Sequence, residues 1–129
     1  MVTDPLSSFI VGLKNAAVVR KEFFSFPYSR LILELSDVLR REGYLSSVSK
    51  RGKKGPRFIE LKLARKNGEN LIHGAKRLSS PSRRQYLKAN KIYPLPSGGI
   101  MIISTTKGLL TGQEVRRERL GGEPLCAFW

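Results

Sequence analysis

The most constraining feature of the sequence is an apolar run that leads directly into a cluster of hydroxyl side chains, at residues 100–110. Isoleucine dominates its first four positions, and this β-branched content predicts a buried strand over residues 100–103. The residues that follow are Ser104, Thr105, Thr106, Lys107 and Gly108. Buried hydroxyls need hydrogen-bond partners, so we expect this cluster at a surface, where glycine lets a backbone approach a ligand closely. Hydroxyls and lysine suit phosphate oxygens, ribose hydroxyls and base edges, although a polar turn after a core strand would have the same local sequence.

The charge of the chain narrows the choice of ligand. Its 129 residues include 24 Lys and Arg against 10 Asp and Glu, which gives a net charge of +14. The excess is concentrated between residues 50 and 91, where Glu60 and Glu69 are the only acids. Self-repulsion of this kind costs stability, so we expect an anionic partner. Nucleic acid is the first candidate and an anionic membrane surface the second, with a simply solvated basic face as the alternative.

Several classes of protein are disfavoured by what the sequence lacks. The single cysteine, Cys126, allows neither an internal disulfide framework nor a cysteine-based zinc site, and the single histidine, His73, has no partner at metal-ligand spacing. We expect structural roles for both, with the cysteine buried. The start of the chain does not resemble a secretory signal, and no apolar run reaches the roughly 20 residues of a membrane span. No nucleophile elbow, phosphate-binding loop or dinucleotide fingerprint is present, so we predict neither an enzyme nor a cofactor.

The first half of the chain has the pattern of two helices with a strand between them. Asp4 predicts the cap of a first helix that runs to about Ala17, and Ser29 predicts the cap of a second that ends before Gly43. Phenylalanine-rich residues 21–26 predict the intervening strand. The residues expected on the buried helix faces are Leu6, Phe9, Ile10, Leu13 and Ala17 in the first helix, and Leu31, Ile32, Leu35, Val38 and Leu39 in the second.

A basic hairpin is expected next. Residues 44–65 predict two strands, and Ile59, Leu61 and Leu63 share one side of the second. The tip between the strands, residues 50–57, has five cations and no acid. We therefore favour contact with phosphates over a solvated loop for this tip.

The second half of the chain is expected to form a small β-rich domain. Polar residues 65–70 predict a turn, which we take as the boundary between a first domain, residues 1–66, and a second, residues 67–129. Thr111 and Glu114 have the spacing of a capping box and predict a short helix after them. The other elements expected here are strands at 71–73, 85–88, 100–103 and 123–129, a second basic loop at 76–84 and a turn at 94–99.

Several motifs together resemble one protein family. The most specific of them are residues 102–111 and residues 121–129. Further matches are Thr3-Asp4-Pro5, Lys14-Asn15-Ala16, Pro27-Tyr28-Ser29-Arg30-Leu31, Arg41-Glu42-Gly43-Tyr44, and Lys76, Arg77, Ser79, Pro81 and Tyr86 in that order. Because the matches extend along essentially the whole chain, the sequence is identified as a member of the family of the eighth protein of the small ribosomal subunit, bacterial type.

The resemblance implies a two-domain α+β protein, with an N-terminal α-β-α-β-β domain followed by a small β-rich domain with one short helix. It implies a structural constituent of the small ribosomal subunit that binds the central domain of small-subunit rRNA directly and supports assembly beside neighbouring ribosomal proteins. Many bacterial members of the family also bind the mRNA of their own operon as translational repressors. The expected location is the bacterial cytoplasmic ribosome, with an organellar ribosome as the alternative and no membrane association.

The resemblance also implies an RNA-binding site. The signature hydroxyls and the lysine behind them would reach the RNA minor groove and an irregular, unpaired core, where ribose hydroxyls and bases are exposed. Tyr86 would stack against or border the RNA, and Glu123 would orient neighbouring groups or form a salt bridge. An N-terminal patch and the basic hairpin would touch phosphate and sugar. The RNA-binding residues that we predict are Ser104, Thr105, Thr106, Lys107, Tyr86, Glu123, Thr3, Asp4, Lys14, Asn15, Lys53, Lys54, Arg57 and Arg77.

The chain departs from the family pattern within residues 79–99. Ser82 stands where glycine is usual, Arg83 stands where an apolar residue is usual, and the loop before Ile100 looks shorter. The resemblance therefore leaves the shape of this segment open, and with it the role of Tyr86. Two other functions remain as alternatives: a free regulator or DNA-binding module that uses the same basic surface, and a phosphoryl-transfer or nuclease enzyme. Such an enzyme would draw its acid–base groups from Asp4, Glu60, Glu69, Glu114, Glu118 and Glu123.

Overall fold

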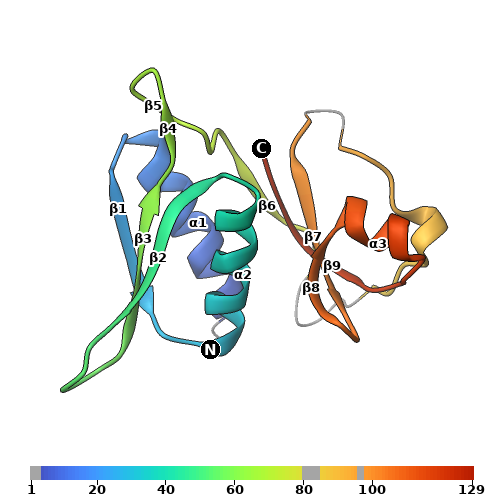
Figure 1. Cartoon of the computed structure of the whole chain (residues 1–129), viewed down its shortest axis with the longest axis horizontal. Helices are drawn as coiled ribbons and strands as arrows, with labels where there is room; N and C mark the ends of the chain where they lie inside the picture. Colours follow the sequence, from blue (N-terminus) through green and yellow to red (C-terminus); the bar gives the residue numbers. More distant parts are fainter. Residues whose placement is uncertain (1–3, 80–84, 96–97) are drawn as a thin grey trace. The chain divides into compact units, whose positions relative to one another are not determined.

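The computed structural model describes residues 4–79, 85–95 and 98–129 (Figure 1). It contains both helices and antiparallel sheets, which confirms the predicted α+β class. Contacts divide the chain into two compact units, Met1–His73 and Gly74–Trp129. This division lies after residue 66, where the polar turn suggested a boundary.

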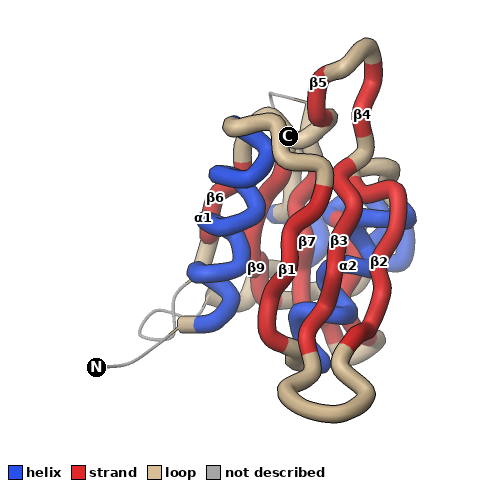
Figure 2. Tube along the Cα trace, turned by 90° about the vertical axis from the view of Figure 1, so that its left-hand side faces the viewer, coloured by secondary structure: helices blue, strands red, loops and turns tan. Residues whose placement is uncertain are grey.

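The N-terminal unit consists of two helices and a three-stranded sheet. Its elements are α1 (Pro5–Val18), β1 (Phe23–Pro27), α2 (Arg30–Arg41), β2 (Leu45–Arg51) and β3 (Phe58–Leu63), followed by a small hairpin of β4 (Arg65–Lys66) and β5 (Glu69–Asn70). The sheet is antiparallel with the order β1-β3-β2, and Figure 2 shows these three strands side by side. The predicted order of helix, strand, helix and hairpin is thus confirmed.

The core of this unit lies between the sheet and the helices. Ile59, Leu61 and Leu63 alternate along β3 and are buried, as predicted. The apolar helix side chains of this unit with no more than 1% exposure are Phe9 and Leu13 of α1 and Ile32, Leu35 and Leu39 of α2. Phe9 also packs against Phe24 and Phe26 of β1, with ring centroids 5.9 and 5.3 Å away. The strand that leads out of the β2–β3 tip is therefore anchored by the core.

One helix cap follows the prediction and the other does not. The hydroxyl of Ser29 accepts a hydrogen bond from the backbone N–H of Ile32 at 3.1 Å, and Gly43 follows α2 with a φ of +90°. Asp4 occupies the N-cap position of α1, but its side chain makes no capping hydrogen bond. The predicted cap is wrong because the carboxylate instead accepts a hydrogen bond from the hydroxyl of Ser7 at 2.5 Å.

Two further predictions for the N-terminal unit are wrong. Leu31 is 41% exposed, because the helix turns it away from the buried face on which Ile32 lies. The strand expected at residues 71–73 is absent, and this segment leaves the β4–β5 hairpin as irregular chain. The hairpin forms because Asn67 and Gly68 adopt φ values of +55° and +79°, which turn the chain back on itself.

The C-terminal unit is built on a four-stranded antiparallel sheet with the order β6-β9-β7-β8. Its elements are β6 (Ala75–Arg77), the short 3₁₀ helix η1 (Ala89–Lys91), β7 (Ile100–Thr105), β8 (Gly108–Thr111), α3 (Gly112–Glu118) and β9 (Glu123–Phe128). The predicted strands around residues 100–103 and 123–129 are present. Because β9 pairs with both β6 and β7, it joins segments that lie far apart in the sequence.

The core of the C-terminal unit is formed by β7, β9 and the elements that cover them. Its fully buried side chains include Ile102, Ile103, Cys126 and Phe128, which confirms the predicted burial of the cysteine. Val115 of α3 packs with Ile103 and with Ile92, which follows η1. Both α3 and η1 are therefore fixed against the strand that carries the hydroxyl cluster.

Helix α3 begins as predicted. The hydroxyl of Thr111 accepts a hydrogen bond from the backbone N–H of Glu114 at 3.2 Å, and the Glu114 carboxylate accepts one from the backbone N–H of Thr111 at 3.1 Å. This reciprocal pair is the capping box that the spacing indicated. The helix ends at Arg119, which has left-handed backbone angles (φ 56°, ψ 37°).

Three parts of the C-terminal unit differ from the prediction. The basic loop expected at residues 76–84 is wrong at its start, because Ala75–Arg77 form strand β6 by pairing with β9. The strand expected over residues 85–88 is reduced to a single bridge between Leu87 and Gly122, because the chain turns into η1 directly afterwards. Strand β8 was not predicted, and it makes the hydroxyl cluster the turn of a hairpin. Of the predicted loops, residues 80–84 and 96–97 lie outside the described residues.

Candidate nucleic-acid interface

The predicted hydroxyl cluster lies at the turn of the β7–β8 hairpin. In the register of this hairpin, Ser104 pairs with Leu109, and Thr105 pairs with Gly108. The two residues between them, Thr106 and Lys107, are exposed. The strand beneath is anchored by isoleucines with no solvent exposure, which are Ile102 and Ile103. The cluster is thus a surface feature carried on a buried strand, as the sequence indicated.

The hydroxyl of Thr105 fixes the shape of this turn. It donates a hydrogen bond to the carbonyl of Gly108 at 2.8 Å and accepts one from the backbone N–H of Lys107 at 3.0 Å. Gly108 has a φ of +98°, a conformation that favours glycine. The predicted RNA contact at Thr105 therefore has a different immediate task, because its hydroxyl holds the turn in one conformation.

Ser104 has a hydroxyl that is available to a ligand. Its side chain is half-buried, and its hydroxyl makes no hydrogen bond to any residue that the structure describes. In the register of β7 with β9, Ser104 faces Glu123. The cluster therefore combines an internally bonded hydroxyl with a neighbouring hydroxyl that can donate or accept outside the protein.

Glu123 is held beside the tip by β9 and by a serine. Its carboxylate Oε1 accepts a hydrogen bond from the hydroxyl of Ser79 at 3.2 Å. Ser79 is only 4% exposed and was not among the predicted site residues, although its place in the family motif gave a signal that could have found it. The glycine before Glu123 is tightly enclosed, since a Cβ on Gly122 would lie 2.5 Å from the carbonyl oxygen of Ser104. Residue 122 must be small for β7 and β9 to approach each other here.

Tyr86 lies next to the same glycine pair. Its ring covers Gly121 so closely that a Cβ there would lie 2.5 Å from the tyrosine hydroxyl, and the next residue, Leu87, bridges to Gly122. The Tyr86 side chain is nevertheless 72% exposed. An exposed ring fixed at its edge is a suitable surface for a stacked base. The structure thus brings Tyr86 close to Glu123 and Ser104 through the Gly121-Gly122 segment.

Arg77 lies on the other side of β9. It belongs to β6 and pairs with Cys126 in the register with β9. Its positive charge acts electrostatically on the pKa of the Cys126 thiol. Burial raises the pKa of Cys126 to about 12, and the nearby Arg77 lowers it by less. The thiol is therefore neutral and unreactive at physiological pH, in agreement with a structural role.

The predicted site residues of the N-terminal unit lie on separate elements. Lys14 and Asn15 are exposed on α1, and Asp4 precedes that helix, while Thr3 lies outside the described residues. The exposed side chains at the β2–β3 tip include Lys53, Lys54 and Arg57. These three cations form no ion pair with any residue in the described part of the chain.

The residues around the β2–β3 tip do have partners. Arg51 lies 3.7 Å from the Glu60 carboxylate across the hairpin, and the ammonium group of Lys50 lies 4.9 Å from the centre of the Tyr28 ring. These contacts order the base of the hairpin, whereas the cations nearest the turn extend into solvent. The tip is therefore a group of unneutralised charges, which suits attraction to a polyanion.

The described residues contain neither of two other kinds of feature, a metal-binding cluster and a membrane-spanning helix. Nowhere in residues 4–79, 85–95 and 98–129 do three or more His, Cys, Asp or Glu side chains gather in a way that could hold a metal ion. In the same ranges, no helix combines the length and apolar character that crossing a membrane requires. The described surface is instead rich in hydroxyl, aromatic and cationic groups, which is the chemistry of nucleic-acid binding.

Comparison with known proteins agrees with this chemistry. The sequence model of the family "Ribosomal protein S8" matches residues 4–129. The chain is 38% identical to the small ribosomal subunit protein uS8 of Sulfurihydrogenibium sp. over 136 aligned residues, which cover 100% of both chains. It is 39% identical to the uS8 protein of Latilactobacillus sakei over 132 aligned residues, which cover 100% of this chain and 99% of the relative. The chain therefore belongs to the ribosomal protein S8 family, which makes it a structural constituent of the small ribosomal subunit and not an enzyme.

Proposed function

We propose that this protein binds the central domain of small-subunit rRNA directly and supports assembly of the subunit. The observation that carries the proposal is the β7–β8 tip, in which one hydroxyl fixes the turn and the adjacent one is left available beside Glu123 and Tyr86. A-form RNA exposes its ribose hydroxyls in a wide, shallow minor groove, and irregular segments expose bases as well. A narrow, rigid protein tip with short hydroxyl side chains is complementary to such a surface.

Each part of the interface has a distinct task in this proposal. Ser104 and Thr106 exchange hydrogen bonds with ribose hydroxyls and base edges, and Lys107 contacts a phosphate. Tyr86 stacks on an unpaired base. Glu123 accepts hydrogen bonds from RNA hydroxyl or amino groups, while Ser79 holds its carboxylate in place.

The N-terminal unit contributes to RNA binding through its positive charges rather than through a surface that matches the shape of the RNA. The free cations at the β2–β3 tip contact phosphates, together with Lys14 and Asn15 on α1, and the N-terminal residues Thr3 and Asp4 approach the sugar-phosphate chain. Arg77 adds a further cation from β6. Neighbouring small-subunit proteins are the other expected partners, and the bacterial relatives make the cytoplasmic ribosome the expected location.

A titration separates this function from general binding to polyanions. The protein is titrated with an rRNA fragment of the central domain that contains an irregular helix, and with DNA of matched length and net charge. We expect a strong preference for the RNA, because DNA lacks the 2′-hydroxyls and A-form groove that the tip contacts. Equal affinity for both would contradict the proposal and favour a basic module without RNA specificity.

The same surface supports a second RNA ligand, the mRNA of the protein's own operon. A tip that contacts sugars and irregular bases recognises the shape of a folded RNA, so an mRNA segment with the same fold would compete for it. The expected results are mutual competition between the two RNAs and reduced translation of a reporter that carries the operon leader. A leader RNA that neither competes nor represses would remove this second function and leave the first intact.

A further inference from the structure

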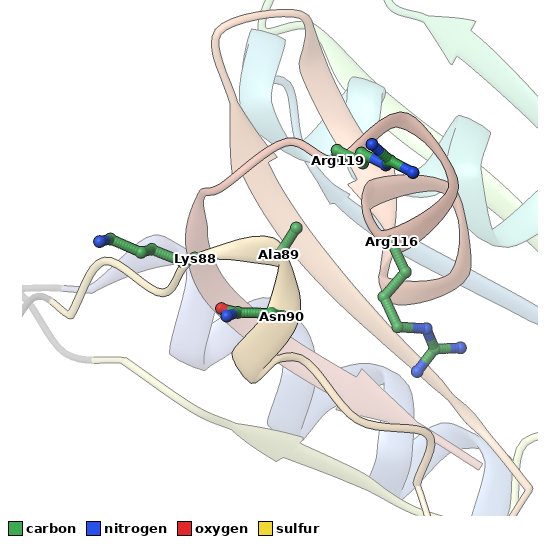
Figure 3. A pocket seen from close by; sticks show the side chains of 5 residues that line it. All are labelled: Lys88, Ala89, Asn90, Arg116 and Arg119. Atoms are coloured by element: carbon green, nitrogen blue, oxygen red, sulfur yellow. The ribbon is translucent and has the colours of Figure 1, made fainter.

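A second candidate ligand site lies in the C-terminal unit, between η1 and α3. This site, the α3–η1 hollow, has a volume of about 500 Å³ and is lined by Lys88, Ala89, Asn90, Arg116 and Arg119. Figure 3 shows the two arginines on the helix and the other three residues on the facing segment. The volume lies within the roughly 300–1,000 Å³ typical of ligand pockets, so it has room for more than a single small ion.

The charge around this hollow is all of one sign. Among the described residues that line it there are three cations and no carboxylate. Neither Lys88 nor Arg119 forms an ion pair with any residue in the described ranges, and Arg116 donates only one long hydrogen bond, 3.4 Å, to the carbonyl of Ile92. Basic residues in the last turn of a helix also complement the helix dipole, which is a possible role for Arg116. That role does not explain Lys88, which precedes η1, or Arg119, which follows the last residue of α3.

Arg119 occupies a position that favours glycine. Its backbone is left-handed, with a φ of 56°, at the residue where a helix commonly ends in glycine. A side chain in this conformation costs stability, and such strain often marks a residue kept for another purpose. Arg119 lines the hollow, so this residue places a cation there where glycine would leave none.

The hollow shares its framework with the proposed RNA site. Lys88 follows Tyr86 by two residues, and Arg119 precedes Gly121 by two, so the two segments joined by the Leu87–Gly122 bridge carry both features. In Figure 3, the side chain of Lys88 extends to the left, away from the helix, and that of Arg116 extends downward, so their charges lie apart. This spread of charge suits an extended anion with successive charged groups better than one compact anion.

We propose that the α3–η1 hollow binds the phosphodiester backbone of the RNA strand that continues from the Tyr86 stacking surface. This inference rests on the proposed function and extends it, because it assigns Lys88, Asn90 and Arg119 to the RNA interface. Lys88 and Arg119 each neutralise a phosphate, and the amide of Asn90 donates to a phosphate or sugar oxygen between them. Arg116 borders the same strand while it holds η1 to the helix through Ile92.

The test uses the full-length chain and the central-domain rRNA fragment, with affinity measured at several salt concentrations. Lys88→Gln and Arg119→Gln should each weaken binding and reduce the slope of log affinity against log salt by about one unit, as expected for one phosphate contact each. The matched control is Arg117→Gln, since Arg117 is exposed on the same helix but does not line the hollow. We expect it to leave the slope nearly unchanged.

Arg119→Gly provides a second measurement that a purely structural role would not reproduce. Glycine relieves the left-handed strain and removes the charge, so we expect a higher midpoint of thermal unfolding together with weaker RNA binding. Unchanged RNA affinity for both Arg119 variants would overturn the inference. If those variants bound RNA normally but failed to join reconstituted small subunits, the hollow would instead hold an acidic segment of a protein neighbour, which also overturns it.

Comparison with Ser104→Ala separates the two proposals. Weaker binding by Ser104→Ala with normal binding by the hollow variants would leave the proposed function standing and remove only the hollow. Normal binding by all of them would remove the proposed function itself.

Discussion

The two hairpin tips of this protein present opposite kinds of surface. The β2–β3 tip, residues 52–57, carries Lys53, Lys54 and Arg57 in solvent without ion-pair partners among the described residues. The β7–β8 tip, residues 104–108, is short and has its turn fixed by the hydroxyl of Thr105. The first tip can attract a polyanion from a distance in many orientations, whereas the second can contact only a surface of matching shape.

The difference indicates how affinity and specificity are divided in the molecule. Long cationic side chains are sensitive to salt and indifferent to sequence, because they interact with phosphates. Short hydroxyl side chains on a rigid turn act only at hydrogen-bonding distance, so they discriminate between RNA shapes. We therefore expect changes at the β7–β8 tip to alter which RNA is bound, and changes at the β2–β3 tip to alter mainly the response to salt.

The largest effect is expected when the hydroxyls of the β7–β8 tip are removed. Ser104→Ala together with Thr105→Ala should reduce the free energy of RNA binding by roughly 1–3 kcal/mol for the Ser104 hydrogen bond removed from a desolvated site. A further loss is expected because the Thr105 hydroxyl no longer fixes the turn. The measurement is a titration with the central-domain fragment at fixed salt. The matched control is Ser46→Ala with Ser47→Ala, since both serines are exposed on β2. An affinity equal to that of the control would mean that the tip is only a turn.

The next effect concerns the support beneath that tip. Gly122→Ala should destabilise the protein by about 1–3 kcal/mol through overpacking, because the new methyl would lie 2.5 Å from the carbonyl oxygen of Ser104 and 2.6 Å from Cγ2 of Ile103. Urea unfolding measures the change. Gly112→Ala is the control, since its methyl would lie 3.4 Å from Ile92, at an ordinary contact distance, and it should cost little. Equal stability of the two variants would show that β7 and β9 are not closely apposed.

A change in stability that is absent at neutral pH is expected in the C-terminal unit at alkaline pH. The pKa of Cys126 is raised from 9.0 to about 12 by burial, so the unfolded chain loses this proton at a lower pH than the folded one. The stabilisation that follows is fully present below pH 9 and is lost between pH 9 and 12, with a slope of at most about 1.4 kcal/mol per pH unit. The difference in unfolding free energy between wild type and Cys126→Ala should fall over this range. A constant difference would contradict the burial of the thiol in the C-terminal unit.

The smallest effect per residue is expected at the β2–β3 tip. Lys53→Gln and Lys54→Gln should each cost under about 1 kcal/mol of RNA binding, because exposed charges are well screened. Each substitution should also flatten the salt dependence of binding by about one unit, since one phosphate fewer is neutralised. Lys21→Gln, at an exposed lysine outside the tip, serves as the control because it changes the net charge by the same amount. If the salt slope were unaltered in both lysine variants, the tip would lie away from the RNA.

Much of the fold could be predicted because local signals and packing agree. The alternation of Ile59, Leu61 and Leu63 predicted a strand that the core then uses, and the spacing of Thr111 and Glu114 predicted a capping box that is present. The sequence did not predict local structure correctly where a side chain has two possible hydrogen-bond partners. The carboxylate of Asp4 binds a side chain instead of the helix backbone, and nothing in its spacing distinguishes the two.

The position of the candidate site in the fold could be predicted from the sequence, but the different roles of its hydroxyl side chains could not. The run of hydroxyl residues indicated where the tip lies. The sequence does not distinguish Ser104 from Thr105, because only the pairing with β8 makes the Thr105 hydroxyl part of the turn. Strand β8 is short and begins with a glycine, so its pairing depends on β7 rather than on its own residues. The α3–η1 hollow could not be predicted from the sequence either, because its residues come from two segments that the tertiary fold brings together, through the Leu87–Gly122 bridge and the packing of Ile92 against Val115.

The place of β9 in the sheet has a consequence for incomplete chains. A copy interrupted before residue 123 would still contain the whole hydroxyl signature, but β7 would lack the neighbour that fills the space between it and β6. Its exposed strand edge would be prone to aggregation, and Glu123 would be missing from the interface. A truncated chain of this kind would therefore fold poorly even though its hydroxyl signature is intact, because the middle strand of the sheet comes from the end of the sequence.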